Sequence, residues 1–294
     1  MMNKEEIHLR RRTWSLKSSP VIAAAGFVLI MATAHAQQAA APAASEGESA
    51  ATNAANNPTT PKLTFEAQDY WMPSVSGLGG RGGSNGLQRN IVPIRTFGFW
   101  NLFHVILPVD TNPNSPGVTQ TGLGGLQLYD LSTVKLHGTT YGAGPLVVLP
   151  TQSGSHFGTQ KWQAGIAGAA IDATKWGLLG GLFTYEHAFG RGTGAITQET
   201  TFQPLIHYNF HHGLYLRSTG LLIFNSGSGI KDIPIGLGAG KVWNFADGKT
   251  INFYMEPQYS VWRSGLGAPD WQLFTGINFQ FPAHLQFWSK ETGH

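Results

Sequence analysis

The residue types that most often carry enzyme chemistry occur in this chain without the spacing that such chemistry needs. Residues 77–82 (GLGGRG) match the glycine pattern of a dinucleotide-binding loop, but they neither follow a predicted parallel strand nor open a helix. The sequence contains no G-x-S-x-G and no H-E-x-x-H motif. His211 and His212 are adjacent, so a solvated turn is favoured over a shared metal site. The sequence therefore predicts no enzyme, no cofactor and no bound metal.

The amino-acid composition excludes further classes of function. The 294 residues include no cysteine, which excludes disulfides, Cys-zinc sites, iron–sulfur clusters and thiol catalysis. The formal net charge is +3. Residues 1–36 hold five basic and two acidic residues, which accounts for the whole excess, and the remaining 258 residues hold 14 of each. Without a basic stripe to neutralise phosphates, we predict no nucleic-acid partner.

The first 36 residues have the three parts of a secretory signal peptide. A basic segment ends at Lys17, an apolar run of 14 residues covers 21–34, and Ala34-His35-Ala36 supplies the small residues at a cleavage site. The apolar run is shorter than the roughly 20 residues that a membrane-spanning helix needs. We therefore predict export and cleavage after Ala36, with an uncleaved anchor as the alternative.

Residues 37–62 consist almost entirely of Ala, Pro, Ser, Thr, Asn, Gln and Glu and contain no aromatic residue. Such a segment has too little apolar surface to offset the conformational entropy that it would lose on ordering. The composition predicts a disordered Ala/Pro-rich leader, and a transient Ala-rich helix is the alternative.

From residue 63 onward the hydrophobic pattern has a period of two. Between 251 and 261 the odd positions are mainly apolar, and most of the even positions are polar. The segments 202–210 and 271–281 alternate in the same way. Because successive side chains of a strand point to opposite faces, each segment is predicted to be a strand with one apolar and one polar face.

Short turns that end in glycine connect neighbouring strands. The three-residue loops 211–213 and 246–248 both end in glycine, which adopts a left-handed backbone without a steric penalty. These loops set the register of the two hairpins, and a slip by one residue would mix the apolar and polar faces. The predicted pairs include Tyr208 with Leu216, His207 with Arg217, and Ala239 with Met255.

The opposite ends of the hairpins carry longer loops that are rich in Gly, Ser, Asn and Pro. Short turns at one end and long loops at the other are typical of outer-membrane barrels of Gram-negative bacteria. The predicted strands are also longer than the roughly 5–6 residues usual in soluble proteins. We therefore predict an all-β fold, a transmembrane antiparallel up-and-down β-barrel of about 12 strands over 63–282, with a periplasmic tail at 283–294. A soluble exported β-protein is the alternative. The strands are expected near 63–75, 87–97, 100–109, 125–135, 139–149, 160–171, 175–187, 197–210, 214–225, 231–245, 249–262 and 270–281.

The polar faces of these strands supply the candidate functional residues. His207 and Arg217 are predicted to pair across neighbouring strands with Glu256 facing the same interior, which would tune permeation or form a structural hydrogen-bond network. A barrel of this size could be narrow, ligand-gated or plugged by 37–62. Glycines at 236, 238 and 240 leave space on the inner face. The candidate lumen-lining residues are Gln203, His207, Asn209, Arg217, Asn252, Glu256 and Gln258.

Several short motifs recur in an order that resembles one bacterial outer-membrane family. They are QRNIVPI at 88–94, WNL at 100–102, ILPV at 106–109, GLGGL at 122–126, GAGP at 142–145, LPT at 149–151, GTQKW at 158–162, PDWQL at 269–273 and FQFP at 279–282. The family is often labelled neuromedin U and is similar to the outer-membrane components of the phenol-degradation meta pathway. The resemblance covers roughly 65–282. The family commonly has an acidic residue where this chain has Gly125, and its members tend to end soon after the last strand.

The resemblance implies a barrel that serves as a channel or transporter and has no established catalytic residues. We expect small molecules, among them hydrophobic or aromatic compounds, to be the solutes, although no specific solute is indicated. A structural or adhesive outer-membrane protein is the main alternative, followed by a barrel-embedded hydrolase. The expected location is the cell outer membrane, and the expected partners are membrane lipids and the outer-membrane assembly machinery. Assembly would use Phe281 as its terminal aromatic signal.

Overall fold

The structure is a computed structural model that describes residues 45–96, 98–115 and 118–282. The predicted signal peptide, residues 37–44 of the predicted leader and the predicted tail at 283–294 lie outside these ranges. The described elements are α2 (Glu46–Asn56), β1 (Lys62–Met72), β2 (Gly83–Thr96), β3 (Phe99–Ser115), β4 (Val118–Leu123), β5 (Leu126–Leu136), β6 (Thr139–Leu149), η2 (Ser155–Phe157), β7 (Trp162–Ala173), β8 (Gly177–Phe189), β9 (Gln198–Asn209), η3 (His211–Gly213), β10 (Leu214–Ser218), β11 (Leu222–Asn225), β12 (Lys231–Gly236), β13 (Gly238–Asn244), β14 (Thr250–Ser264) and β15 (Trp271–Pro282).

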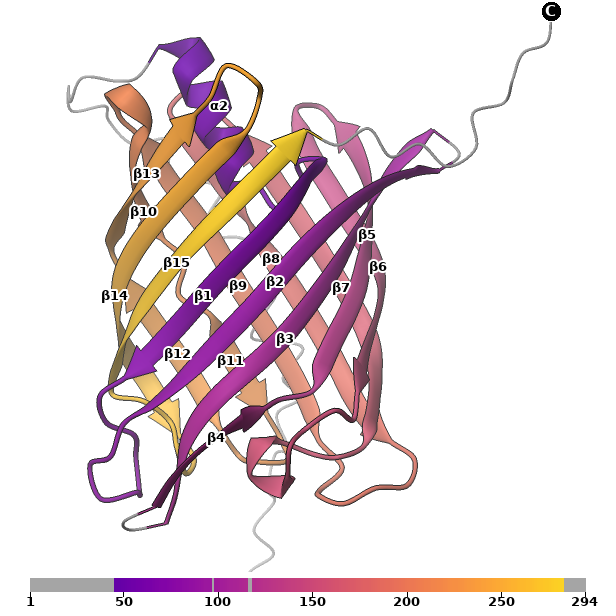
Figure 1. The fold of residues 1–294 in the computed structure, drawn as a ribbon, viewed down its shortest axis with the longest axis vertical. Helices are drawn as coiled ribbons and strands as arrows, with labels where there is room; N and C mark the ends of the chain where they lie inside the picture. Colours follow the sequence, from indigo (N-terminus) through magenta and orange to yellow (C-terminus); the bar gives the residue numbers. More distant parts are fainter. Residues whose placement is uncertain (1–44, 97, 116–117, 283–294) are drawn as a thin grey trace, which may run out of the picture. The chain divides into compact units, whose positions relative to one another are not determined.

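The strands form a closed antiparallel barrel (Figure 1). Its wall has twelve strand positions, called staves below, and two of them are each made of two shorter strands. β10 and β11 together make one stave, because both pair with β9, and β12 and β13 make the next, because both pair with β14. β4 pairs only with β3 and adds no stave. The first and last strands, β1 and β15, pair along their length and close the wall. This architecture confirms the predicted fold class.

The predicted hairpin registers are confirmed. Leu216 pairs with Tyr208 and Ala239 pairs with Met255. The loop that sets the first register contains His212 and Gly213, both with a left-handed backbone at φ 63° and 70°. Glycine adopts this conformation without strain, so the turn fixes the register that separates the apolar from the polar face.

Several strand bounds differ from the prediction, since 214–225 and 231–245 are each divided into two strands and the ends of β2 and β3 shift. β2 begins at Gly83 rather than at 87, and β3 continues to Ser115, where it pairs with β4. Parts of the predicted loops 76–86 and 110–124 are therefore strands. Backbone hydrogen bonds extend this hairpin past the barrel, where neither face needs an apolar pattern, so the alternation gave no signal.

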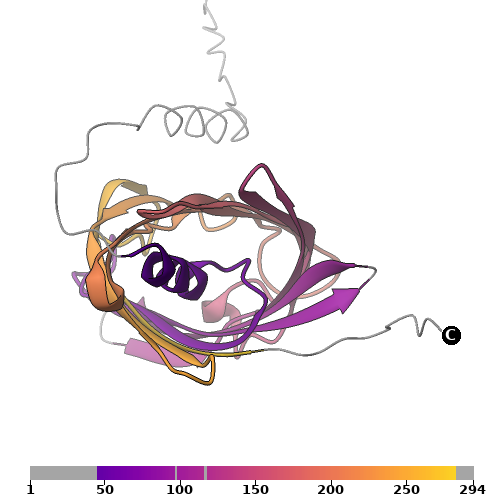
Figure 2. The ribbon, with the colours of Figure 1, turned by 90° about the horizontal axis from the view of Figure 1, so that it is seen from above.

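The predicted disorder of 37–62 is wrong for residues 46–56, which form α2 inside the ring of strands (Figure 2). Ser45 caps the helix by accepting a hydrogen bond from the backbone N–H of Glu48 at 3.4 Å. Ser49, Thr52 and Asn53 are buried against the polar barrel interior. The composition argument failed because this helix is ordered largely by polar contacts with the wall, and the wall supplies the aromatic side chains around its one buried apolar residue, Ala55. No helix in the described ranges is long and apolar enough to span a membrane.

The outer surface of the barrel is apolar along the strands. On β14, Phe253, Met255, Tyr259 and Val261 are 42–63 % exposed, whereas the residues between them face the interior. Tryptophans at the strand ends are also exposed, which is the position of the aromatic girdles of membrane barrels. The exposed tryptophans are Trp71, Trp162, Trp176, Trp243, Trp262 and Trp271.

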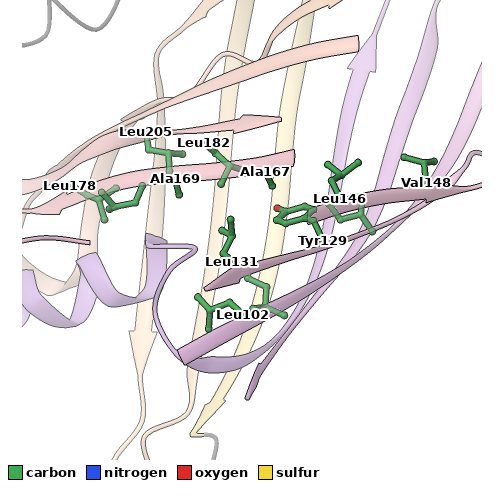
Figure 3. Packing of buried hydrophobic residues seen from close by; sticks show 13 residues of the cluster. Leu102, Tyr129, Leu131, Leu146, Val148, Ala167, Ala169, Leu178, Leu182 and Leu205 are labelled. Carbon is green, nitrogen blue, oxygen red and sulfur yellow. The ribbon is translucent and has the colours of Figure 1, made fainter. Parts of the chain in front are cut away.

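The interior has an apolar half and a polar half. Inward side chains of β2, β3 and β5 to β9 form one hydrophobic cluster that includes Leu102, Leu131, Ile171 and Leu178 (Figure 3). On the opposite side, the inner faces of β1, β10 and β12 to β15 carry mostly polar and aromatic side chains around α2. The division is not strict, because buried polar side chains such as His104 and Glu186 also lie on strands of the hydrophobic cluster. β9 contributes to both sides, with Leu205 in the cluster and Asn209 beside α2.

Inward glycines make room for large side chains in the polar half. A Cβ at Gly240 would lie 2.3 Å from the ring of Tyr215, and one at Gly276 would lie 2.3 Å from Tyr254. A Cβ at Gly236 would lie 2.5 Å from a carboxylate oxygen of Glu256. The space predicted beside these glycines is thus filled by the protein's own side chains.

We expect Gly240→Ala to lower the free energy of unfolding by about 1–3 kcal/mol, because the added methyl overlaps the Tyr215 ring. Gly168→Ala is the matched control, since its Cβ would meet only the carbonyl oxygen of Gly142 at 3.8 Å. Urea unfolding of both variants in detergent, followed by tryptophan fluorescence, measures the difference. Equal midpoints for the two variants would contradict the packing argument.

Candidate functional site in the barrel interior

The seven candidate residues all lie in the barrel interior and are at most 8 % exposed. They come from three staves that carry the polar half. β9 supplies Gln203, His207 and Asn209, β10 supplies Arg217, and β14 supplies Asn252, Glu256 and Gln258. They separate into an ionic network, a pair of residues that hold α2, and a single histidine that belongs to neither group.

The ionic network is centred on Arg217 and Glu256. The guanidinium Nε of Arg217 donates to Glu256 Oε2 at 2.9 Å, and its Nη2 donates to Thr219 Oγ1 at 2.7 Å. The Thr219 hydroxyl also donates to Glu256 Oε2 at 2.7 Å. The guanidinium carbon lies 3.7 Å from the centroid of the Tyr254 ring, within cation–π range. Both charges are buried and both are fully engaged.

This network replaces strand pairing where a stave is interrupted. β10 ends at Ser218 and β11 begins at Leu222. Between them, the backbone N–H of Thr219 donates to Glu256 Oε1 at 2.8 Å, and Gln203 Nε2 donates to the Thr219 carbonyl at 3.2 Å. Side chains thus satisfy backbone groups that would otherwise be buried without partners. Gln258 extends the network by donating to Glu256 and accepting from Gln272 of β15.

Asn209 and Asn252 hold α2 inside the barrel. Asn209 Nδ2 donates to Asn53 Oδ1 at 2.8 Å, and Asn252 Nδ2 donates to Asn56 Oδ1 at 3.0 Å. Asn53 in turn donates to the backbone carbonyl of Thr174 at 2.8 Å. The helix therefore sits against the short turns at one end of the barrel.

One ion pair and one histidine–carboxylate contact join the first turn of α2 to neighbouring turns. Lys175 Nζ lies 2.6 Å from Glu46 Oε1, and His211 Nδ1 lies 3.7 Å from Glu48 Oε2. The hydrogen bond and charge of Lys175 hold the pKa of Glu46 below its ordinary value and raise the pKa of Lys175 in return. Because the Glu46–Lys175 pair is exposed to water, it orients the helix more than it stabilises it.

His207 lies apart from both groups. It is 2 % exposed, and its ring meets Tyr215 edge to face with centroids 5.4 Å apart. Within the described residues, neither of its ring nitrogens has a hydrogen-bond partner. The predicted register pairs it with Arg217, as the backbone does. Both side chains line the same cavity, but no hydrogen bond joins them.

The candidate set missed residues on β1 and β2. Glu66 accepts a hydrogen bond from Tyr254 Oη at 2.8 Å, and Gln68 donates to the same hydroxyl at 2.7 Å. Arg89 donates to Gln68 Oε1 at 3.2 Å. The signal was present in the sequence, because the odd positions of β1 are mainly apolar apart from Asp69. The even positions, which include Glu66 and Gln68, therefore face inward.

A cavity lies between α2 and the polar half of the wall. It has about 650 Å³ of empty space, part of it open to solvent. Gln203, His207, Arg217 and Asn252 line it. Ile91, Leu182 and Leu205 form an apolar side of the same cavity. The arrangement offers a small, amphipathic space inside the barrel.

Comparison with known proteins identifies the fold. No family model matches the chain, and no curated protein matches its sequence. Among solved structures, the COG4313 outer membrane channel from Pseudomonas putida F1 is similar, with a TM-score of 0.54 and 12 % sequence identity. The match covers 75 % of this chain and 96 % of that protein. The likeness shows that the two share a barrel fold.

We expect removal of either partner of the Arg217–Glu256 pair to cost about 3–5 kcal/mol of unfolding free energy, because each change leaves a buried charge uncompensated. The variants Arg217→Met, Glu256→Gln and their combination form a double-mutant cycle. The double variant should lose less than the sum of the two single variants. Lys249→Ala, which breaks the exposed pair with Asp247, is the control and should change stability little. Strict additivity in unfolding experiments would show that the buried pair is not coupled.

Proposed function

We propose that this protein is an outer-membrane channel or transporter for small molecules and that α2 is its plug. The observation that carries the proposal is a closed twelve-stave barrel whose interior contains a helix, α2, that is not part of the wall. The apolar outer face is suited to lipid. The fold shared with an outer membrane channel from another bacterium supports the same conclusion.

The interior supports transport over a purely structural role. A barrel that served only as a scaffold could fill its whole interior with apolar side chains, as the half around Leu131 does. The other half keeps a cavity lined by polar groups, some of them without partners in the described chain. Unpartnered buried polar groups reduce stability, so their presence beside a cavity favours contact with a solute or with water.

α2 is suited to being displaced. It is joined to β1 by residues 57–61, and it contacts the wall through side-chain hydrogen bonds and through one small apolar residue, Ala55, in the aromatic cluster. Asn53 has the most such contacts, because it bonds to both Asn209 and Thr174. Movement of the helix out of the barrel end would break these bonds without disturbing the pairing of the strands.

The proposal extends to location, partners and solute class. The secretion signal at 1–36 would export the chain, the assembly machinery would insert it in the outer membrane, and lipids would contact its apolar face. We propose transport without catalysis. The amphipathic cavity favours small solutes with an apolar part, which includes the hydrophobic and aromatic compounds expected from the resemblance.

We expect deletion of 45–57 from the mature chain to raise single-channel conductance severalfold in planar bilayers, because the barrel end would lose its plug. A milder change, Asn53→Ala, should increase the frequency of opening without altering the open conductance, since it removes two contacts of the helix. Ala50→Ser, on the exposed face of α2, is the matched control and should behave as the parent protein does.

Two outcomes would contradict the proposal in different ways. Equal conductance before and after the deletion would remove the role of α2 as plug. Absence of conductance, and of solute entry in liposome swelling, from every folded variant would reject the channel and favour a structural or adhesive role. Heat-modifiable migration in detergent gels verifies that each variant is folded.

A further inference from the structure

Glu66 and Arg89 are neighbours in the barrel wall that do not form an ion pair. They are direct cross-strand partners on β1 and β2, and both line the cavity beside α2. Opposite charges in this position ordinarily attract and pair. In the described ranges, however, no carboxylate oxygen lies within 4.0 Å of the Arg89 guanidinium.

Each of the two charges forms its hydrogen bonds with neutral groups and none with the other charge. Glu66 accepts from the hydroxyl of Tyr254 at 2.8 Å. Arg89 donates to Gln68 at 3.2 Å and, more weakly, to the hydroxyl of Tyr129 at 3.5 Å. A guanidinium has five N–H donors, so most of the donor capacity of Arg89 is unused by these contacts.

Arg217 shows what a satisfied arginine looks like in the same barrel. Its guanidinium meets Glu256 at 2.9 Å and Thr219 at 2.7 Å, and it lies over an aromatic ring. Arg89 also has two hydrogen-bond partners, but both are neutral and none is a carboxylate. The contrast within one lumen indicates that the separation of Glu66 and Arg89 leaves a place for a charged ligand.

His207 supplies independent evidence for a ligand in this cavity. It lines the cavity, is 2 % exposed, and has both ring nitrogens without a partner among the described residues. A buried imidazole without hydrogen bonds is costly. A ligand or water that occupies the cavity would supply the missing partner.

The apolar side of the cavity defines the rest of the ligand. Ile91, Leu182 and Leu205 line the same space as the two charges. The cavity has about 650 Å³ of empty space, part of it open to solvent, so it suits a small ligand with one apolar group.

We infer that the cavity binds a small zwitterion with an apolar side chain, of the class of the aliphatic α-amino acids. The ligand carboxylate meets Arg89, its ammonium meets Glu66, and its side chain lies against Ile91, Leu182 and Leu205. A ligand without net charge keeps the charge balance of the site, whereas a simple carboxylate would face Glu66 and a simple amine would face Arg89. This inference rests on the proposed function and names its solute class.

The test is isothermal titration calorimetry on the refolded mature chain in detergent micelles, with L-leucine as the probe. Two analogues each lack one charge: 4-methylpentanoate has no ammonium group and 3-methylbutylamine has no carboxylate. We expect L-leucine to bind at least about tenfold more tightly than either analogue, because each analogue leaves one buried charge of the site unpaired.

Substitutions assign the two ends of the ligand. Arg89→Gln should weaken L-leucine binding about tenfold or more, and Arg95→Gln, the same change at an exposed position of β2, should leave it unchanged. Glu66→Gln should abolish the preference for L-leucine over 4-methylpentanoate. These changes keep the size of the side chains close to the original, and heat-modifiable migration verifies folding.

The outcomes separate this inference from the proposed function. Equal affinity for L-leucine and 4-methylpentanoate in the parent protein would overturn the zwitterion, and so would unchanged binding in Arg89→Gln. Absence of L-leucine binding in a protein that conducts would overturn the inference and leave the channel in place. Binding by a protein that never conducts would support the site and reject the channel.

Discussion

Pairing of β1 with β15 is the constraint on which the rest of the structure depends. It leaves the barrel without an edge, so the wall exposes no row of unpaired backbone groups to lipid, where each would cost several kcal/mol. Closure also fixes the direction of every side chain, because alternation along a strand gives one face to the outside and the other to the interior. The apolar surface and the polar lumen are therefore two consequences of one register.

In a closed barrel the polar side chains that face inward are buried, and each needs a hydrogen-bond partner inside the lumen. A hydrophobic cluster reduces the number of such groups on one side of the lumen, and hydrogen bonds between inward side chains satisfy many of them on the other. His207 is an exception among the described residues. The break in the stave after Ser218 shows the rule most directly, because the side chains of Glu256 and Gln203 take the place of the missing strand partners of Thr219. α2 acts in the same way on Asn209 and Asn252.

The sequence predicted those features that follow from alternation and from turns. Gly213 and Gly248 set two registers that the structure confirms, and the polar parity of β14 places Asn252, Glu256 and Gln258 on the interior. It offered a helix and a plug within 37–62 only as alternatives to disorder, because Ser49 and Asn53 are ordered by polar partners more than 100 residues away in the chain. Arg89 and Glu66 were within reach of the same parity argument, but their failure to pair is a property of side-chain geometry that no residue pattern encodes.

The two arginines of the lumen show how similar residues divide between stability and function. Arg217 contacts a carboxylate, a hydroxyl and an aromatic ring, so its charge is compensated by groups of the barrel itself. Arg89 keeps its charge beside a cavity, with its nearest opposite partner along the wall turned toward Tyr254. Holding opposite charges apart forgoes part of their attraction. Gln68 bonds to Arg89 and Tyr254 bonds to Glu66, so these two neutral side chains orient the charges toward the cavity as positioning residues.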